Sequence, residues 1–394
     1  MKSILKLAVI RILQWESRLV IKKYKPKIVA ITGSVGKTST KDAIAGCIGS
    51  VTTVRKSKKS YNSEIGLPLT ILGCPNGWNN PFAWLENIFY GLTLIIFRRP
   101  FPQWLVLEVG IGKPGDMKRT ASWLRTDIVV TSRFGTTPVH VEFFGSPDGV
   151  SLEEFSLVSS LKEDGTLIVN ADDETVPGLL KQIPWKGNLV RYGFGESADI
   201  RGTHAQILYE KNEKGWQKPV GMSFRVEGKG NSIPIVVRGG VGAGHLSAPL
   251  AAFAVVVVTD MNPAIALRAF DNAEALFQGG RMRLILGREG STIIDDTYNA
   301  SPIAMHAAVE VLSSIETNGR RIAVLGDMLE LGRHTDDEHR KVGELIARLG
   351  NIHILITVGP RSMMIAEAAK EAGYPADRIV SYRETSQVFE PLTD

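Results

Sequence analysis

Short apolar runs rich in β-branched residues recur along the first half of the chain, and helical stretches separate them. Residues 27–32 (KIVAIT), 104–109 (WLVLEV) and 126–131 (TDIVVT) show little alternation of apolar and polar positions, which is typical of strands buried on both faces. A further strand is predicted over residues 166–170, and a helix opens near residue 37. Alternation of such strands with helices predicts a parallel sheet that helices cover on both faces.

The pattern changes near residue 200 and again near residue 280. Residues 200–240 contain alternating segments typical of antiparallel strands at a sheet edge, and residues 248–258 predict a buried helix. After Gly280 a second α/β pattern begins, Rossmann-like in rhythm but without the Gly-x-Gly-x-x-Gly turn that dinucleotide binding requires. Its predicted strands are residues 291–295, 321–325, 352–358 and 379–382, and its predicted helices are residues 303–315 and 337–349.

Two other apolar stretches do not fit a buried strand. Residues 1–26 mix basic and apolar positions without a long uncharged segment or a small-residue cleavage site, so we predict an amphipathic helix rather than a signal peptide. Residues 84–97 (WLENIFYGLTLIIF) are strongly apolar but too short to span a bilayer. For each stretch two interpretations stay open: a helix packed on the body of the protein, and a weak contact with a membrane surface.

Composition narrows the class of protein. A chain of 394 residues is expected to form two or three domains, and 44% apolar with 22% charged residues is the balance of a globular protein with a full core. The formal charge of +5 suits anionic ligands such as nucleotides, and no aromatic and basic interleaving predicts nucleic-acid binding. Cys47 and Cys74 fit neither a metal site nor a disulfide framework, so we expect a reducing, cytoplasmic compartment.

The most specific motif follows the first predicted strand. Residues 33–39 (GSVGKTS) join that strand to a helix, and adjacent backbone N–H groups at such a junction form a cradle for phosphate oxygens. Lys37 adds a positive charge at the β- and γ-phosphates of ATP, and the Thr38 hydroxyl is a ligand for Mg²⁺. A plain strand-to-helix turn, the structural alternative, would leave Lys37 unexplained. The predicted nucleotide-binding residues of the loop are Gly33, Ser34, Val35, Gly36, Lys37, Thr38 and Ser39.

This loop and five further strings resemble the Mur ligase family, whose members form amide bonds in peptidoglycan precursors at the expense of ATP. The last two strings are the most specific, and they resemble the branch that adds D-alanyl-D-alanine. The resemblance implies that ATP activates a carboxylate as an acyl phosphate, which an amino group then attacks. The matching strings are residues 31–40 (ITGSVGKTST), 61–69 (YNSEIGLPL), 108–115 (EVGIGKPG), 140–149 (HVEFFGSPDG), 295–302 (DDTYNASP) and 321–332 (RIAVLGDMLELG).

The strand pattern and the resemblance together predict an α/β protein with two principal domains. We expect an amphipathic helix over residues 1–26, a central P-loop ATPase domain with a mostly parallel sheet over residues 27–280, and a smaller Rossmann-like domain over residues 281–394. Only 32 residues precede Gly33, so the N-terminal domain with which this branch holds its UDP-sugar is expected to be absent. A partner protein that supplies the missing substrate domain is a further expectation.

The resemblance also assigns roles around the phosphate loop. ATP's γ-phosphate must approach a second anion, which is why Mg²⁺ and a lysine are needed. By resemblance, Lys37 acts in catalysis, and Glu108 and His140 bind magnesium together with Thr38. Glu154 falls where the family carries a carbamylated lysine, so we expect it to be another magnesium ligand. The structural alternatives are a capped loop carboxylate for Glu108, a surface histidine for His140 and a solvated helix-face glutamate for Glu154.

Other residues resemble the part of the family's site that holds the nucleoside. Asp296 resembles the ribose-binding acid, Tyr298 and Asn299 lie near the adenine, and Arg281 reaches ATP's phosphates. His245 stands at the asparagine position of a His-Asn pair near the adenine. A helix cap at Asp296 and a linker charge at Arg281 are the structural alternatives.

Three functions stay open. The first is a ligase that adds D-alanyl-D-alanine, and the second is a ligase of the same fold that acts on another acid, such as a polyglutamate or cyanophycin-type substrate. The third is a nucleotide-binding partner subunit without activity of its own. A C-terminal Lys-Gly-Ser-Arg-like string of the family is missing, and Asp327 either lines the amine pocket or is a turn acid. No Ser/His/Asp or Cys/His set predicts a covalent nucleophile.

Overall fold

The computed structural model describes residues 3–58, 61–211, 215–275 and 279–388. Its largest element is a nine-stranded sheet with the strand order β2-β3-β1-β4-β5-β6-β7-β8-β9. Neighbours from β2 to β7 are parallel, whereas β7–β8 and β8–β9 are antiparallel, which confirms the predicted parallel sheet with an antiparallel edge. The strands are β1 (Lys27–Thr32), β2 (Val54–Lys56), β3 (Trp104–Glu108), β4 (Thr126–Thr131), β5 (Leu161–Asn170), β6 (Asn188–Gly193), β7 (Ile200–Lys211), β8 (Gln217–Gly228) and β9 (Asn231–Arg238).

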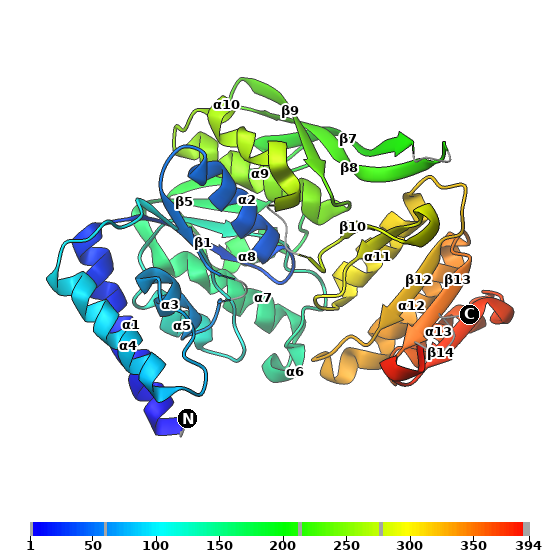
Figure 1. Ribbon diagram of the computed structural model, residues 1–394, viewed down its shortest axis with the longest axis horizontal. Helices are drawn as coiled ribbons and strands as arrows, with labels where there is room; N and C mark the ends of the chain where they lie inside the picture. Colours follow the sequence, from blue (N-terminus) through cyan, green and yellow to red (C-terminus); the bar gives the residue numbers. More distant parts are fainter. Residues whose placement is uncertain (1–2, 59–60, 212–214, 276–278, 389–394) are drawn as a thin grey trace.

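Helices cover both faces of this sheet (Figure 1). On one face, α2 (Lys37–Gly49) and α9 (Ala243–Val258) pack against Val29 and its neighbours in one core. On the other face, α3 (Gly66–Leu72) packs in a second core that contains Ile28. Successive side chains of a strand point to opposite faces, so the unbroken apolar run of β1 supplies both cores. The other helices of this part are α5 (Asp116–Ala121), α6 (Val141–Phe144), α7 (Pro147–Phe155), α8 (Val176–Gln182) and α10 (Pro263–Ala266), with 3₁₀ helices η1 (Ser156–Ser160) and η2 (Leu267–Ala275).

The two apolar stretches outside the strand pattern form neighbouring helices. Helices α1 (Ser3–Tyr24) and α4 (Pro81–Ile96) lie side by side at one edge of the molecule and contact α3 (Figure 1). Leu13 of α1 and Trp84 of α4 are buried in their shared core, so one side of each helix packs on the body. Within the described ranges, no helix combines the length and the apolar character needed to cross a bilayer.

Residues beyond 280 form a ribbon and a smaller sheet. β10 (Arg283–Leu286) and β11 (Thr292–Asp295) pair antiparallel, whereas β12 (Ile322–Gly326), β13 (Ile354–Val358) and β14 (Ile379–Tyr382) form a parallel sheet. The predicted strand over residues 291–295 is found as β11, but it pairs with β10, a strand that was not predicted. The helices here are α11 (Pro302–Ser314), α12 (Thr335–Leu349) and α13 (Met363–Glu371), with 3₁₀ helices η3 (Arg288–Gly290), η4 (Gly332–His334), η5 (Ala376–Arg378) and η6 (Thr385–Val388).

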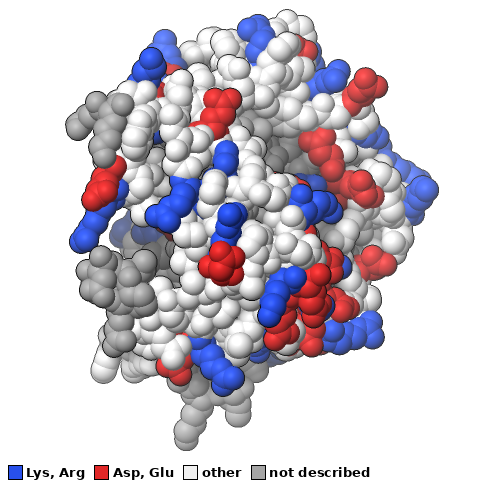
Figure 2. Space-filling model, turned by 90° about the vertical axis from the view of Figure 1, so that its right-hand side faces the viewer, with Lys and Arg blue, Asp and Glu red and all other residues white. Residues whose placement is uncertain are grey.

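Figure 2 shows the side of the molecule on which this smaller sheet lies. Acidic and basic side chains are interspersed over this side. Among the described residues, the basic side chains form no continuous stripe there.

Candidate active site

The phosphate-binding loop lies between the carboxyl end of β1 and the start of α2. Gly33 and Gly36 have φ angles of 124° and 88°, which glycine adopts with little strain because it lacks a Cβ atom. A Cβ atom on Gly33 would also collide with Ser132. The backbone N–H of Ser34 donates a hydrogen bond of 2.8 Å to the carbonyl oxygen of Arg133. The residues that follow β4 therefore hold the loop in its tight conformation.

Lys37, the first residue of α2, folds back onto its own loop. Its Nζ contacts the carbonyl oxygen of Gly33 and lies 3.3 Å from Oε1 of Glu154. Oε2 of the same carboxylate accepts a hydrogen bond of 2.8 Å from Ser34 Oγ. Glu154 belongs to α7 and is only 3% exposed, which is incompatible with a solvated helix-face glutamate. In this structure Glu154 is the counter-ion of the loop lysine.

A second carboxylate lies directly beside Thr38. Glu108 ends β3, and its side chain accepts hydrogen bonds from Thr38 Oγ1 at 3.0 Å and from Asn62 Nδ2 at 3.3 Å. The Nζ of Lys41 lies 3.6 Å from the same carboxylate, and both charged groups are buried. Buried charges are stable only when they are paired and hydrogen-bonded, as they are here. Asn62 and Lys41 were not predicted as site residues, although Asn62 lies in the matching string 61–69.

The oxygen atoms of Thr38 and Glu108 have the chemistry of a magnesium site. Mg²⁺ prefers hard oxygen ligands and is usually held by one or two carboxylates, by waters and by substrate phosphates. In the described part of the chain, no three His, Cys, Asp or Glu side chains cluster closely enough to hold a metal ion. The structure thus brings Thr38 and Glu108 together, but it does not gather the predicted set with Glu154 and His140 in one place.

His140 reaches toward the C-terminal part of the molecule. It precedes α6 with a φ angle of 69°, and its Nδ1 lies 2.6 Å from Oε2 of Glu330. Nearby, Thr137 Oγ1 donates a hydrogen bond of 3.0 Å to Oε1 of Glu338 on α12. The segment after β4 therefore bridges the two parts of the chain. The contact with Glu330 uses Nδ1, and histidines that bind a metal through one ring nitrogen commonly pair the other with a carboxylate.

Predicted nucleoside-binding residues gather at the junction near residue 280. Nε2 of the buried His245 lies 2.9 Å from the carbonyl oxygen of Arg281, and burial lowers the pKa of His245 more than this hydrogen bond raises it. The Arg281 guanidinium carbon lies 4.1 Å from the centroid of the Tyr298 ring, and Asn299 beside it is exposed. The buried Nε of Arg281 has no hydrogen-bond partner among the described residues. Buried donors are usually paired, so this guanidinium is suited to an anionic ligand.

Asp296 lies at the same junction, and its charge is unfavourable there. Its Oδ1 accepts a hydrogen bond of 3.1 Å from the Met282 N–H. Burial raises the pKa of Asp296 to about 6, against the opposing effects of this hydrogen bond and of Arg281. The folded-state pKa therefore exceeds the unfolded value of about 4. Ionisation of Asp296 therefore lowers the free energy of unfolding. This loss is absent below about pH 4 and complete above about pH 6.

Replacing Asp296 with asparagine is expected to stabilise the protein at neutral pH only. The variant loses the buried charge but keeps an oxygen that accepts the Met282 N–H, so its free energy of unfolding should rise by about 2 kcal/mol at pH 7.5. Near pH 4 the wild-type side chain is itself largely neutral in the folded state, so the gain should shrink sharply. Thermal denaturation at the two pH values measures this, and equal gains at both would contradict it.

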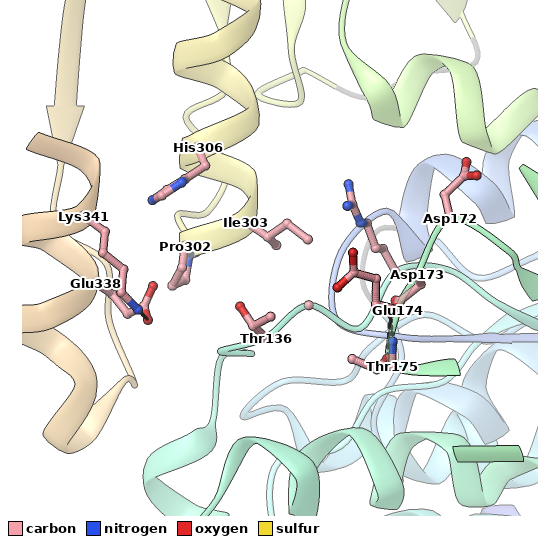
Figure 3. A pocket seen from close by; sticks show the side chains of 12 residues that line it. Thr136, Asp172, Asp173, Glu174, Thr175, Pro302, Ile303, His306, Glu338 and Lys341 are labelled. Atoms are coloured by element: carbon pink, nitrogen blue, oxygen red, sulfur yellow. Dashed lines mark hydrogen bonds and ion pairs between the residues drawn. The ribbon is translucent and has the colours of Figure 1, made fainter. Parts of the chain in front are cut away.

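A pocket of about 320 Å³ opens where the segments after β4 and β5 face α11 and α12 (Figure 3). Asp172 and Glu174 lie on one side of it, and His306, Glu338 and Lys341 lie on the other (Figure 3). Burial lowers the pKa of His306. The pocket therefore offers groups of both charge signs. Its lining residues are Arg133, Gly135, Thr136, Asp172, Asp173, Glu174, Thr175, Pro302, Ile303, His306, Glu338 and Lys341.

Asp327 does not line this pocket. Its Oδ1 accepts hydrogen bonds from the backbone N–H groups of Arg361 and Ser362 at 3.0 and 2.7 Å. Asp327 is therefore the turn acid that was the structural alternative. None of the pocket residues was predicted as a site residue, because they come from four separate segments, although Pro302 ends the matching string 295–302.

Comparison with known proteins matches two domains of one family to this chain. The Mur ligase middle domain matches residues 88–237, and the Mur ligase glutamate ligase domain matches residues 280–392. The UDP-N-acetylmuramoyl-tripeptide–D-alanyl-D-alanine ligase of Bacillus subtilis is 28% identical over 97% of this chain and 73% of its own length. The Escherichia coli ligase of the same name is 28% identical over 89% of this chain and 69% of its own length.

Solved structures share the fold. MurF from Acinetobacter baumannii superimposes with a TM-score of 0.77 at 22% identity, over 98% of this chain and 73% of that one. MurF from Thermotoga maritima, solved in complex with ADP, gives a TM-score of 0.70 at 22% identity, over 96% of this chain and 81% of that one. Matches to two successive Mur ligase domains, together with relatives that align along nearly the whole sequence, identify the family. This chain belongs to the Mur ligase family.

Proposed function

We propose that this protein is an ATP-dependent ligase that converts a carboxylate into an acyl phosphate and joins it to an amine. The proposal rests on two side-chain pairs that lie next to each other at the phosphate-binding loop. Lys37 is paired with the buried Glu154, and Thr38 is hydrogen-bonded to the buried Glu108. Lys37 supplies a positive charge for the phosphoryl group that is transferred, and Thr38 and Glu108 supply oxygen ligands for Mg²⁺.

The residues of the loop would act by positioning and by charge. The N-terminus of α2 favours phosphate oxygens, and Lys37 would exchange Glu154 for the β- and γ-phosphates when ATP binds. Thr38 and Glu108 would hold Mg²⁺, which when bound neutralises the phosphates so that the carboxylate can approach. Glu154, once released by Lys37, would remain close to the loop, where its carboxylate would be a further oxygen ligand for Mg²⁺. No covalent enzyme intermediate is needed, because the acyl phosphate is itself the activated species.

The C-terminal part would complete the nucleotide site. Arg281, whose Nε has no hydrogen-bond partner in the described part of the chain, would bind a phosphate. Asp296 would bind the ribose, and Tyr298 and Asn299 would lie near the adenine. The contact of the His245 ring with the Arg281 carbonyl ties this junction to α9. We retain residue 280 as the boundary between the central and C-terminal domains, with the N-terminal helix before residue 27. Closure of the two domains over ATP is expected.

We further propose that the acids and amines are those of the D-alanyl-D-alanine ligases to which the chain is similar. A dipeptide acceptor carries an ammonium group and a carboxylate. The pocket beside the loop provides Glu174 for the first and Arg133 for the second. Lys341 is already paired with Glu338, and Asp172 accepts hydrogen bonds from the backbone of Phe194 and Gly195. Because the pocket lies between the two parts of the molecule, closure would bring the amine toward the acyl phosphate.

Release of ADP with defined substrate pairs tests this proposal. Turnover that requires both UDP-N-acetylmuramoyl-tripeptide and D-alanyl-D-alanine would support the specific reaction. Turnover with another acid, such as a polyglutamate, would keep the ligase chemistry and change the substrate. Absence of turnover with every pair, despite ATP binding, would favour a nucleotide-binding subunit that works with a partner protein.

Replacing Glu154 with glutamine should lower Mg²⁺-dependent turnover by roughly tenfold to a hundredfold. The amide keeps the shape and the hydrogen bond with Ser34 Oγ, but it no longer provides a negative charge beside Lys37. Steady-state kinetics against Mg²⁺ concentration measure the effect. Glu163→Gln, at an exposed position in β5, is the matched control, and turnover of Glu154→Gln equal to that of the control would remove Glu154 from the mechanism.

A further inference from the structure

Helices α1 and α4 form a fixed pair that runs in one direction. Lys23 of α1 donates hydrogen bonds to the carbonyl oxygens of Leu94 and Ile95 near the end of α4, at 2.9 and 2.8 Å. Nearer the start of each helix, Gly91 of α4 lies so close to Glu16 of α1 that a Cβ atom on Gly91 would collide with the Glu16 carboxyl group. Since the contacts follow the same order along both helices, the helices are parallel.

The outer side of this pair is apolar and exposed. Phe82, Leu85 and Phe89 of α4 are 78%, 61% and 72% exposed, and Trp15 of α1 is 52% exposed. With 3.6 residues per turn, Phe82, Leu85, Phe89 and Ile96 share one stripe of α4, opposite the buried Asn87 and Leu94. Trp15 likewise lies opposite the buried Leu13 and Val20 of α1, so the exposed apolar residues of both helices face away from the body. We call this surface the α1–α4 face, which consists of Ile12, Trp15, Phe82, Leu85, Phe89 and Ile96.

Basic residues border the α1–α4 face. In the described residues 3–25 and 76–100 the acidic residues are Glu16, which is buried, and Glu86, which is exposed. Few negative charges therefore offset the positive charges around the face. The exposed basic residues of the two helices and the segment after α4 are Lys6, Arg11, Arg18, Lys22, Lys23, Arg98 and Arg99.

An apolar, aromatic face with a basic border matches the surface of an anionic bilayer. Aromatic rings favour the level of the lipid headgroups, and lysine and arginine are attracted to anionic lipids. Monomeric proteins rarely expose contiguous apolar patches of this kind. A second copy of the chain fits less well, because a symmetric contact would set two basic borders against each other.

We propose that the α1–α4 face binds the surface of an anionic lipid bilayer. Its apolar side chains enter the boundary between headgroups and acyl chains, and its basic residues contact the lipid phosphates. Since no described helix can cross a bilayer, the pair lies along the surface. Figure 1 places α1 and α4 at the edge of the molecule opposite the C-terminal sheet, so this attachment leaves the candidate active site open.

Flotation of the purified full-length protein with vesicles tests the proposal without any ligase substrate. The protein should float with vesicles of phosphatidylcholine mixed with phosphatidylglycerol, but weakly or not at all with phosphatidylcholine alone, and added salt should weaken the binding. Leu85→Asp combined with Phe89→Asp should reduce the partition coefficient by at least about tenfold. Arg18→Ala combined with Lys22→Ala should reduce it by roughly tenfold on the anionic vesicles.

Leu286→Asp is the matched control, because Leu286 on β10 is 71% exposed and lies outside the α1–α4 face. It should float like the wild type, and all variants should melt at the wild-type temperature. The proposal is overturned if the wild type does not float with anionic vesicles, or if the Leu85 and Phe89 double variant floats equally well. It is also overturned if sedimentation reveals a dimer that this double variant dissociates while vesicles bind neither form.

Discussion

Lys37→Ala is expected to reduce ligase turnover on the order of a thousandfold while leaving the protein folded. The ε-ammonium of Lys37 is the one charged side chain of the loop itself, and it would neutralise the phosphoryl group as it transfers. Removal of a charge placed for the transition state costs far more than removal of a surface charge, because charge interactions are stronger in an active site of low dielectric constant than in water. Steady-state release of ADP, with the substrate pair that supports wild-type turnover, measures the loss.

Two comparisons make this result specific. Lys370→Ala changes an exposed lysine on α13 and should leave turnover unchanged. Lys37→Ala should also lower the free energy of unfolding, because the buried Glu154 carboxylate loses its counter-ion, although it keeps the hydrogen bond from Ser34 Oγ. Thermal denaturation therefore has to show that the variant is folded at the assay temperature. If Lys37→Ala turned over within about tenfold of the wild type, far less than removal of such a charge costs, the assignment of the loop as the catalytic phosphate site would be wrong.

Glu108→Gln is expected to lower turnover on the order of a hundredfold and to shift the Mg²⁺ dependence to higher concentrations. The amide still accepts a hydrogen bond from Thr38 Oγ1, but it is a poor ligand for a hard cation. Initial rates measured over a Mg²⁺ titration report both effects. A rate loss without a changed Mg²⁺ dependence would contradict a metal-binding role for Glu108.

Loss of the Glu108 charge also removes a carboxylate from beside the buried Lys41, and among the described residues Asp42 stays within 3.5 Å of its Nζ. Breaking such a pair costs about 3–5 kcal/mol, so the glutamine variant risks unfolding. Glu108→Asp is the second variant. Its side chain keeps the negative charge but is one methylene group shorter, so the carboxylate lies farther from Thr38 and the proposed Mg²⁺. It should fold and still require more Mg²⁺ than the wild type. Wild-type Mg²⁺ dependence in this variant would count against the role.

The strands and the phosphate loop could be predicted because their signals are local. β1 and β4 coincide with the predicted residues 27–32 and 126–131, since β-branched runs buried on both faces have few alternatives. The start of α9 at Ala243 was missed by five residues, because Gly244 and its glycine-rich surroundings conceal the first helical turn. The antiparallel pairing of β11 was missed because its partner β10 is short and largely exposed.

The contacts of the candidate site could not be predicted, because they join distant segments. Glu154 meets Lys37 across 117 residues, and Thr137 meets Glu338 across 201 residues. The resemblance to the Mur ligases indicated that Glu154 belongs near the loop, but not that it would be the counter-ion of Lys37. The pairing of His140 with Glu330 had no signal in the sequence either.

Equilibrium titration of the purified protein with ATP, in the presence and in the absence of Mg²⁺, tests the central claim most directly. The residues around the loop predict saturable binding at submillimolar ATP with Mg²⁺ and clearly weaker binding without it, on the order of tenfold. Lys37→Ala should bind more weakly than the wild type under both conditions. No binding at millimolar ATP, or binding that neither Mg²⁺ nor the lysine affects, would contradict the account.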